Sequence, residues 1–230
     1  MRKLLIGLLL LAALGVGADF VAARVFEGRV ASALERRYEL GTRPVVQVRD
    51  FPFLPRLLSG RLETIDLAAR DARAGDVTLD GVEVHLHRVT VPRRVLLGGR
   101  GVVRVGEADG QVRLSESQIN RLVAERLRGG SLAIGADGVR VRVRTEFLGR
   151  PLSATVGGRL GVREGLITFR PETVEIDGVR DPGLEAQLAS RFTFDAPLPP
   201  LPAGIRVDRV ETAPGMLILA GRAAALEVPA

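Results

Sequence analysis

The chain has 230 residues, and its 46% of hydrophobic residues is enough for the core of one large domain or two small ones. Its net charge is +6, but the basic residues are nearly all arginines spread along the chain, and there is one Tyr and no Trp for stacking bases. Composition therefore argues against nucleic-acid binding. The absence of cysteine excludes disulfides, a thiol nucleophile and a cysteine-linked lipid anchor.

The N-terminus has the order of a secretory signal. Arg2 and Lys3 precede an apolar run from Leu4 to Gly17, which is the usual succession of a charged and a hydrophobic region. The run is shorter than the roughly 20 residues that a helix needs to span a bilayer, so an anchor would also need the residues that follow it. Val21–Ala23 form a small-residue cleavage site. The sequence predicts export, and residues 1–23 are either a signal peptide or a retained membrane anchor.

The next segment has the spacing of an amphipathic helix. Between Phe20 and Leu40, apolar residues recur every three or four positions, with charged residues between them. Gly41 and Pro44 end this pattern. We therefore expect a helix over 24–40, followed by a different kind of structure.

From residue 45 onwards the sequence predicts strands, because short runs of β-branched residues alternate with Gly, Asp and Pro. One helix is predicted at Glu116–Leu127, where Ser115 and Gln118 can form a capping box. A second is predicted from 181 or 182 to 190, before a proline-rich loop at 196–204. Strands are predicted at 45–50, 61–69, 75–79, 82–87, 102–106, 110–114, 139–144, 152–160, 165–170, 173–177, 205–211 and 216–227.

This order of elements predicts an α+β, β-rich fold. Glycine-containing turns favour antiparallel connections over crossovers. We expect one long curved antiparallel sheet that wraps around one or two helices. No internal repeat or low-complexity linker is present between residues 24 and 230, so the sequence predicts a single domain behind the segment 1–23, with a helix at 24–40 and a β-rich body at 45–230.

Residue patterns that could support catalysis are few. Glu83, His85 and His87 project from one face of a predicted strand, where His-x-His can hold a metal, but a site needs a third or fourth ligand. The same pattern is typical of the polar face of a strand. The chain has no G-x-S-x-G elbow, P-loop or dinucleotide-binding motif. We expect no enzyme, no metal site and no cofactor.

The segment from Phe51 to Leu62 is unusual in composition, with two phenylalanines, two prolines and four leucines around Arg56 and Arg61. One interpretation is structural: a loop and a helical turn that close one end of the core. The other is functional: an apolar lip whose two arginines bind a phosphate, because the guanidinium fork matches phosphate oxygens.

The same segment carries a family resemblance. Phe51–Leu54 followed by Leu57–Leu62 resembles the opening signature of the LmeA family of phospholipid-binding proteins from actinobacteria. The amphipathic helix, the strand-rich middle, the loop at 198–205 and the stretch at 215–221 resemble that family in the same order. The resemblance implies a place outside the cytoplasmic membrane, phospholipid binding, and support of mannan elongation in lipomannan synthesis. It implies no catalytic residues.

A protein that takes up phospholipid needs a cleft about as apolar as the bilayer, because each buried methylene is worth about 0.8 kcal/mol. We expect a sheet with an apolar cleft, similar to half of a tubular, BPI-like lipid-binding module. Arg56 and Arg61 are the expected headgroup ligands, although Pro55 and Arg56 depart from the family pattern and leave headgroup preference open. The expected lipid-binding residues are Phe51, Phe53, Leu54, Leu57 and Leu58 on one side of the mouth, and Phe192, Phe194, Leu198 and Leu201 on the other.

The expected partners are phospholipid, the membrane surface or an N-terminal membrane anchor, and proteins of envelope biosynthesis. The expected location is the extracytoplasmic cell envelope or periplasm. Two alternatives stay open. One is an anchored envelope scaffold without a lipid cavity, in which the segment from Phe51 to Leu62, called the Phe-Pro segment below, docks a protein. The other is a hydrolase or transferase with two carboxyl groups roughly 5 to 9 Å apart.

Overall fold

A computed structural model describes residues 2–38, 40–74, 77–96, 98–127, 130–147, 150–180, 194–197 and 205–229. The chain divides into two compact units. The first comprises Met1–Ala72, Glu83–Asp109 and Ala223–Ala230, and the second comprises Arg73–Val82 and Gly110–Arg222. The predicted α+β class, with a large antiparallel sheet and an N-terminal helix, is confirmed.

Four helices and twelve strands are assigned among the described residues. The helices are α1 (Arg2–Tyr38), α2 (Phe53–Ser59), α3 (Arg93–Leu96) and α4 (Glu116–Leu127). The strands are β1 (Val45–Val48), β2 (Arg61–Ala74), β3 (Val77–Thr90), β4 (Val102–Ser115), β5 (Ser131–Ile134), β6 (Val139–Phe147), β7 (Arg150–Arg163), β8 (Leu166–Ile176), β9 (Val179–Arg180), β10 (Phe194–Pro197), β11 (Arg206–Ala213) and β12 (Met216–Pro229).

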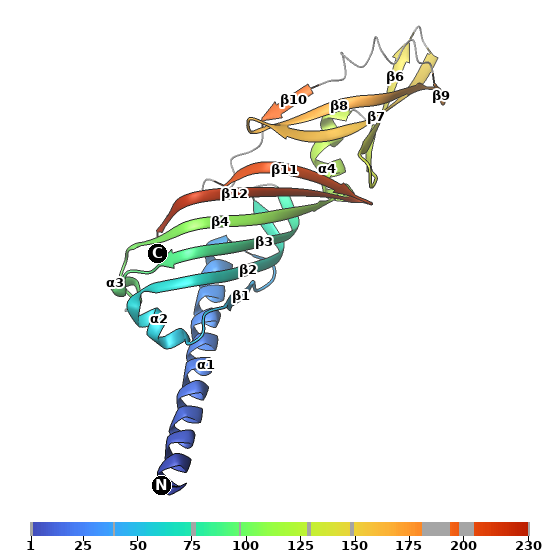
Figure 1. The fold of residues 1–230 in the computed structure, drawn as a ribbon. Coiled ribbons are helices and arrows are strands. Elements are labelled where there is room, and N and C mark those ends of the chain that lie inside the picture. The colour runs from blue at the N-terminus through green and yellow to red at the C-terminus, as the bar shows by residue number, and fades with distance from the viewer. Residues whose placement is uncertain are drawn as a thin grey trace. The chain divides into compact units, whose positions relative to one another are not determined.

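The strands form two hydrogen-bonded sheets where we expected one. The first has the order β1-β2-β3-β4-β12-β11, and the second has the order β10-β8-β7-β6-β5, with β9 paired to β8 (Figure 1). The chain leaves the first sheet through α4, builds the second sheet from β5 to β10, and returns to the first with β11 and β12. A pattern of alternating residues defines each strand but does not say which strands share a ladder.

Helix α1 joins the apolar run and the amphipathic segment into one element. Its 37 residues correspond to about 55 Å of helix at 1.5 Å per residue. The leucines from Leu8 to Leu14 are exposed, among them Leu9 at 68% and Leu14 at 73%. By length and composition, Ile6–Arg36 can cross a membrane. Figure 1 shows this blue N-terminal half extending beyond the strands of the first unit.

The C-terminal half of α1 is built into the first unit. The side chain of Glu27 accepts a hydrogen bond from the backbone N–H of Val48 at 2.9 Å, which ties the helix to β1. The rings of Phe26 and Phe53 lie 5.4 Å apart, in a tilted pair that favours contact between α1 and α2. Ala31 is 4% exposed. This part of α1 therefore has protein contacts that fix its position in the first unit.

The second unit has its own apolar core around α4 and the second sheet. Asn120 of α4 exchanges two hydrogen bonds with the backbone of Leu132 in β5, at 2.7 and 2.8 Å. The strands predicted at 165–170 and 173–177 are one strand, β8, because Pro171 lies opposite Gly158 at a register shift, where a ladder donor is dispensable. The buried residues of this core are Leu114, Ile134, Val139, Val156, Phe169, Val174 and Leu217.

Two sequence expectations fall on parts of the chain outside the description. The helix expected from 181 or 182 to 190 lies outside the described residues, as does most of the loop expected at 196–204. The first two residues of that loop, 196 and 197, instead end strand β10. By contrast, the helix expected at Glu116–Leu127 is confirmed as α4.

Candidate functional site

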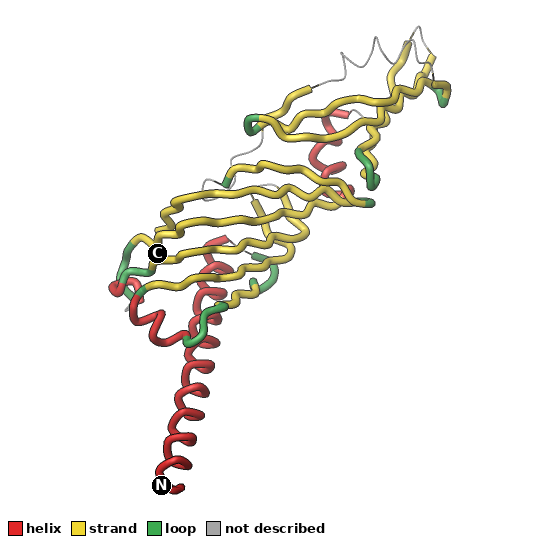
Figure 2. Tube along the Cα trace, in the orientation of Figure 1, coloured by secondary structure: helices red, strands yellow, loops and turns green. Residues whose placement is uncertain are grey.

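An apolar cleft of about 380 Å³ lies where α1 meets the chain that leads into α2. In Figure 2 the loop before α2, drawn green, passes beside α1. The lining residues are Ala12, Gly15, Val16 and Asp19 from α1, and Phe51, Pro52, Leu54 and Pro55 from the segment around the start of α2. Since Asp19 is the single polar side chain among them, the cleft suits hydrocarbon better than a polar ligand.

Asp19 fixes the geometry of this cleft. Its carboxylate is 6% exposed. One oxygen accepts a hydrogen bond from the backbone N–H of Phe53 at 2.7 Å, and the other accepts from Leu54 at 2.6 Å. These N–H groups belong to the first turn of α2, where Pro52 at the N-cap supplies no side-chain acceptor. Asp19 therefore caps a helix that is 34 residues away in sequence, and its negative charge complements the helix dipole.

The sequence makes α2 short and holds it in place. Pro52 and Pro55 stand at and near its start, where a missing N–H costs no helical hydrogen bond. Gly60 ends the helix in the left-handed conformation, with φ of 73°. A Cβ atom at Gly60 would lie 2.6 Å from the carbonyl oxygen of Val91. Glycine thus allows both the turn and the close approach that position α2 against the strands of the first unit.

The five residues of the Phe-Pro segment that we expected to contact lipid have different surroundings in the structure. Phe51 and Leu54 line the cleft. Phe53 is 1% exposed and packs in the core. Leu58 is 68% exposed, as is Phe51, and Leu57 is partly buried. Phe53 therefore has the core-filling role of the structural interpretation, while Phe51 and Leu54 face the cleft and Leu58 faces the surface.

The opposite side of the predicted mouth is not described to the same extent. Phe192, Leu198 and Leu201 lie outside the described residues. The backbone of Phe194 lies in β10, in register with Phe169 of β8, but its side chain is not described. These positions belong to the second unit, whereas the cleft belongs to the first.

The two predicted headgroup arginines have different surroundings. The guanidinium of Arg56 lies 3.0 Å from Glu63 and 3.3 Å from Oδ1 of Asp50. The side chain of Asp50 is 1% exposed and its Oδ1 has no hydrogen-bond partner, so Arg56 supplies the positive charge that balances this buried carboxylate. A phosphate would compete with two carboxylates for Arg56. Arg61 is exposed and has no ion-pair partner among the described residues.

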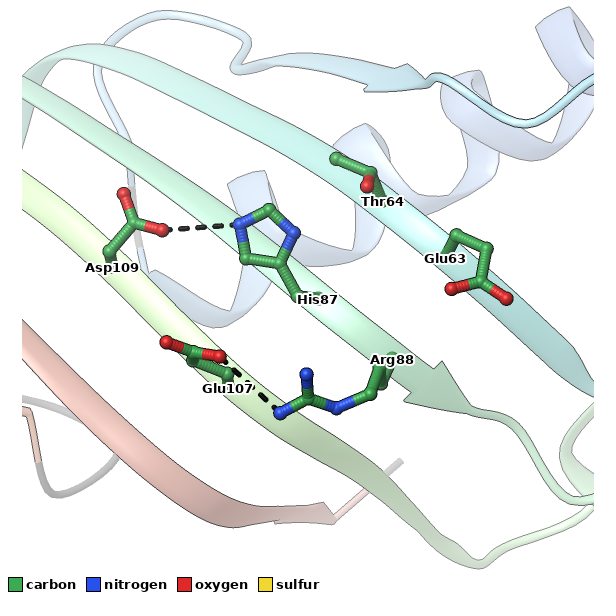
Figure 3. A pocket seen from close by; sticks show the side chains of 6 residues that line it. All are labelled: Glu63, Thr64, His87, Arg88, Glu107 and Asp109. Carbon is green, nitrogen blue, oxygen red and sulfur yellow. Dashed lines mark hydrogen bonds and ion pairs between the residues drawn. The ribbon is translucent and has the colours of Figure 1, made fainter.

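A second, polar hollow of about 400 Å³ lies on the sheet of the first unit. Figure 3 shows its six lining residues, Glu63, Thr64, His87, Arg88, Glu107 and Asp109. His87 lies 3.2 Å from Asp109, and Arg88 lies 3.3 Å from Glu107. Exposed pairs of this kind contribute little to stability. Within the described part of the chain, no group of three or more His, Cys, Asp or Glu side chains could hold a metal ion.

His85, on the same strand, is coupled to Asp66. Its Nδ1 lies 2.8 Å from Asp66, and this hydrogen bond raises the pKa of His85 above its ordinary value against the opposing effect of burial. At Asp66, burial acts to raise the pKa of the carboxyl group. Hydrogen bonds from His85 and Arg49 outweigh this effect, so the pKa lies below its ordinary value. A raised folded-state pKa means that protonated His85 stabilises the fold below its ordinary pKa of 6.5, and that this contribution is lost as pH rises through the raised value.

We predict that Asp66→Asn lowers the pKa of His85 towards its ordinary value, because the substitution removes the negative charge that favours the imidazolium. The measurement is an NMR titration of the imidazole resonances in the whole protein. Asp137→Asn, at an exposed carboxylate, is the matched control and leaves the titration unchanged. An unshifted His85 titration in Asp66→Asn would contradict the assignment.

We also predict that Asp19→Ala destabilises the first unit, because two N–H groups of α2 lose their acceptor. An unsatisfied buried donor costs about 1–3 kcal/mol. Asp208→Asn is the control, since Asp208 is half-exposed and pairs with Arg222 at 3.8 Å; its effect is about 0.5 kcal/mol or less. Thermal unfolding followed by circular dichroism measures both. Equal midpoints for the two variants would show that Asp19 does not hold α2.

Sequence reasoning missed Asp19. The backbone groups that it binds, those of Phe53 and Leu54, lie far along the chain. The available signal was an acidic residue at the end of an apolar run, together with a Pro-flanked helix start that lacks a capping side chain.

Comparison with known protein families matches most of the chain. A sequence model of the LmeA-like phospholipid-binding family matches residues 17–222, which include Asp19, the Phe-Pro segment and most of both units. No curated protein and no solved structure matches the chain. Because the match extends over most of the 230 residues, the chain belongs to the LmeA-like phospholipid-binding family.

Proposed function

We propose that this protein binds phospholipid, without catalysis, at the extracytoplasmic face of the membrane in which its N-terminal helix stays anchored. The observation that carries the proposal is the apolar cleft that α1 builds together with the segment Phe51–Pro55. Family membership supports phospholipid binding. The order of charges and apolar residues at the N-terminus supports export.

The size of the cleft suits part of an acyl chain. Clefts that bury a whole drug-sized ligand measure roughly 300–1,000 Å³, and this one is about 380 Å³. Each methylene that leaves the bilayer forfeits about 0.8 kcal/mol and regains a similar amount in an apolar cleft. The exchange is therefore close to neutral, and an acyl chain can enter without a dedicated ionic site for the headgroup.

Retention of the N-terminal segment is supported by Asp19. Cleavage after Ala23 would remove this carboxylate and leave the N–H groups of Phe53 and Leu54 without their acceptor. It would also remove the α1 half of the cleft wall. The family match begins at residue 17, ahead of that cleavage position. We therefore include in the proposal that residues 1–23 are an anchor and not a signal peptide.

The proposal extends to the biological setting that the resemblance implies. A phospholipid-binding protein anchored in the envelope would support mannan elongation in lipomannan synthesis alongside envelope biosynthesis enzymes.

Filling the cleft tests the proposal directly. In Gly15→Leu, the new side chain occupies the cleft, and no atom lies within 4 Å of its Cβ position to cause a clash. Overpacking costs about 1–3 kcal/mol, so we expect phospholipid to bind roughly 5- to 150-fold more weakly. Gly7→Leu is the matched control, because Gly7 also has open space around its Cβ position but does not line the cleft.

Native mass spectrometry of the full chain, purified in mild detergent, gives both readouts. We expect wild type and Gly7→Leu to carry phospholipid, Gly15→Leu to lose it, and all three to have masses that include residues 1–23. Equal phospholipid occupancy in Gly15→Leu and Gly7→Leu would show that phospholipid does not bind in the cleft. A wild type that carries no phospholipid would favour the scaffold alternative, and a mass that begins after Ala23 would contradict the anchor.

A further inference from the structure

We infer that the segment from Phe51 to Leu58 inserts into the bilayer beside α1, so that the cleft opens directly to the hydrocarbon of one leaflet. The inference rests on the proposed function, which places α1 in the membrane. It adds a docking surface whose partner is the lipid bilayer itself. Three features of the first unit support it: the depth of the segment along α1, its backbone hydrogen bonds and its exposed side chains.

The depth follows from the cleft wall. Phe51 and Pro55 share the cleft with α1 residues from Ala12 to Asp19. At 1.5 Å per residue, Ala12 lies about 10 Å further along the helix axis towards the N-terminus than Asp19. Ala12 and Val16 belong to the apolar run that lies in hydrocarbon when α1 crosses the membrane. A segment that lines the same cleft must therefore reach the same depth.

The backbone of the segment satisfies the main requirement of a hydrocarbon environment. Lipid tails offer no hydrogen-bond partner, so an exposed N–H group costs several kcal/mol there. Pro52 and Pro55 have no N–H, and the N–H groups of Phe53 and Leu54 are bound to Asp19. Four consecutive residues thus present no free backbone donor.

The side chains of the segment from Phe51 to Leu58 are also suited to a position within the bilayer. Phe51 and Leu58 are each 68% exposed in the first unit, and a bilayer would cover them. Arg56, the only charged residue between them, is already paired with Asp50 and Glu63. These carboxylates reduce the cost of bringing its charge close to the membrane.

The next turn of α1 has the composition of a membrane interface. The guanidinium of Arg24 lies 5.3 Å over the ring of Phe20 and 3.6 Å from the carboxylate of Glu27, and its side chain is 67% exposed. Aromatic rings followed by arginine are typical of the headgroup level, where the ring meets the acyl boundary and the guanidinium reaches phosphates. Phe20 and Arg24 therefore mark the membrane surface just beyond the depth assigned to Phe51.

Tryptophan fluorescence tests the insertion, because the chain contains no native Trp. Phe51→Trp and Leu58→Trp are each placed in the full chain and reconstituted into phosphatidylcholine–phosphatidylglycerol vesicles with brominated acyl chains. Leu14→Trp reports the apolar half of α1, and Val179→Trp reports an exposed position in β9 of the second unit. We expect emission from positions 14, 51 and 58 to be blue-shifted and quenched several-fold more than emission from position 179.

Phospholipid retained by the reisolated protein separates this inference from the proposed function. Retained lipid with unquenched emission at positions 51 and 58 would overturn the insertion and leave the proposed function standing. Quenching at these positions without retained lipid would support insertion and overturn lipid binding. Unquenched emission at position 14 would overturn the placement of α1 on which both depend.

Discussion

The hydrogen bonds that the first N–H groups of α2 donate to the carboxylate of Asp19 are the constraint on which the site depends. They join a helix at the start of the chain to a helix that begins after the first strand. Without an acceptor at this point, the N-terminus of α2 would need water, and water would enter the apolar cleft. With the acceptor, the cleft wall stays apolar, because the carboxylate of Asp19, its one charged group, is bound to the N–H groups of α2. The same carboxylate thus satisfies the N-terminus of α2 and links α1 to the folded body.

A site of this kind accounts for how little recognisable chemistry the sequence contains. Hydrocarbon is bound through apolar area and not through directed polar groups, and burial in the cleft replaces burial in the bilayer at a similar free energy. Selectivity for a headgroup would then come from the surface around the cleft. Of the two arginines expected to meet a headgroup, Arg56 is shared between Asp50 and Glu63, while Arg61 is exposed.

Sequence patterns predicted local structure well and long-range contacts poorly. Helix α4 has the predicted bounds, because its cap and apolar spacing are local signals. The alternation of residues located most strands but not their division into two sheets, since ladder partners are chosen in three dimensions. Two of the residues expected from the composition of the Phe-Pro segment, Phe51 and Leu54, line the cleft, and their contact with lipid stays a prediction. Asp19 escaped notice, and Arg56 was assigned only to phosphate, because the partners of both lie on other elements.

The most direct test of the central claim is to map where a phospholipid touches the protein. The full chain would be reconstituted with a phospholipid that carries a diazirine on one acyl chain, irradiated, digested and sequenced by mass spectrometry. The account predicts adducts on the two walls of the cleft, at residues 12–19 and 51–55, with both sets weakened together when Asp19 is replaced. Adducts spread evenly along the exposed apolar face of α1, with none at 51–55, would contradict it.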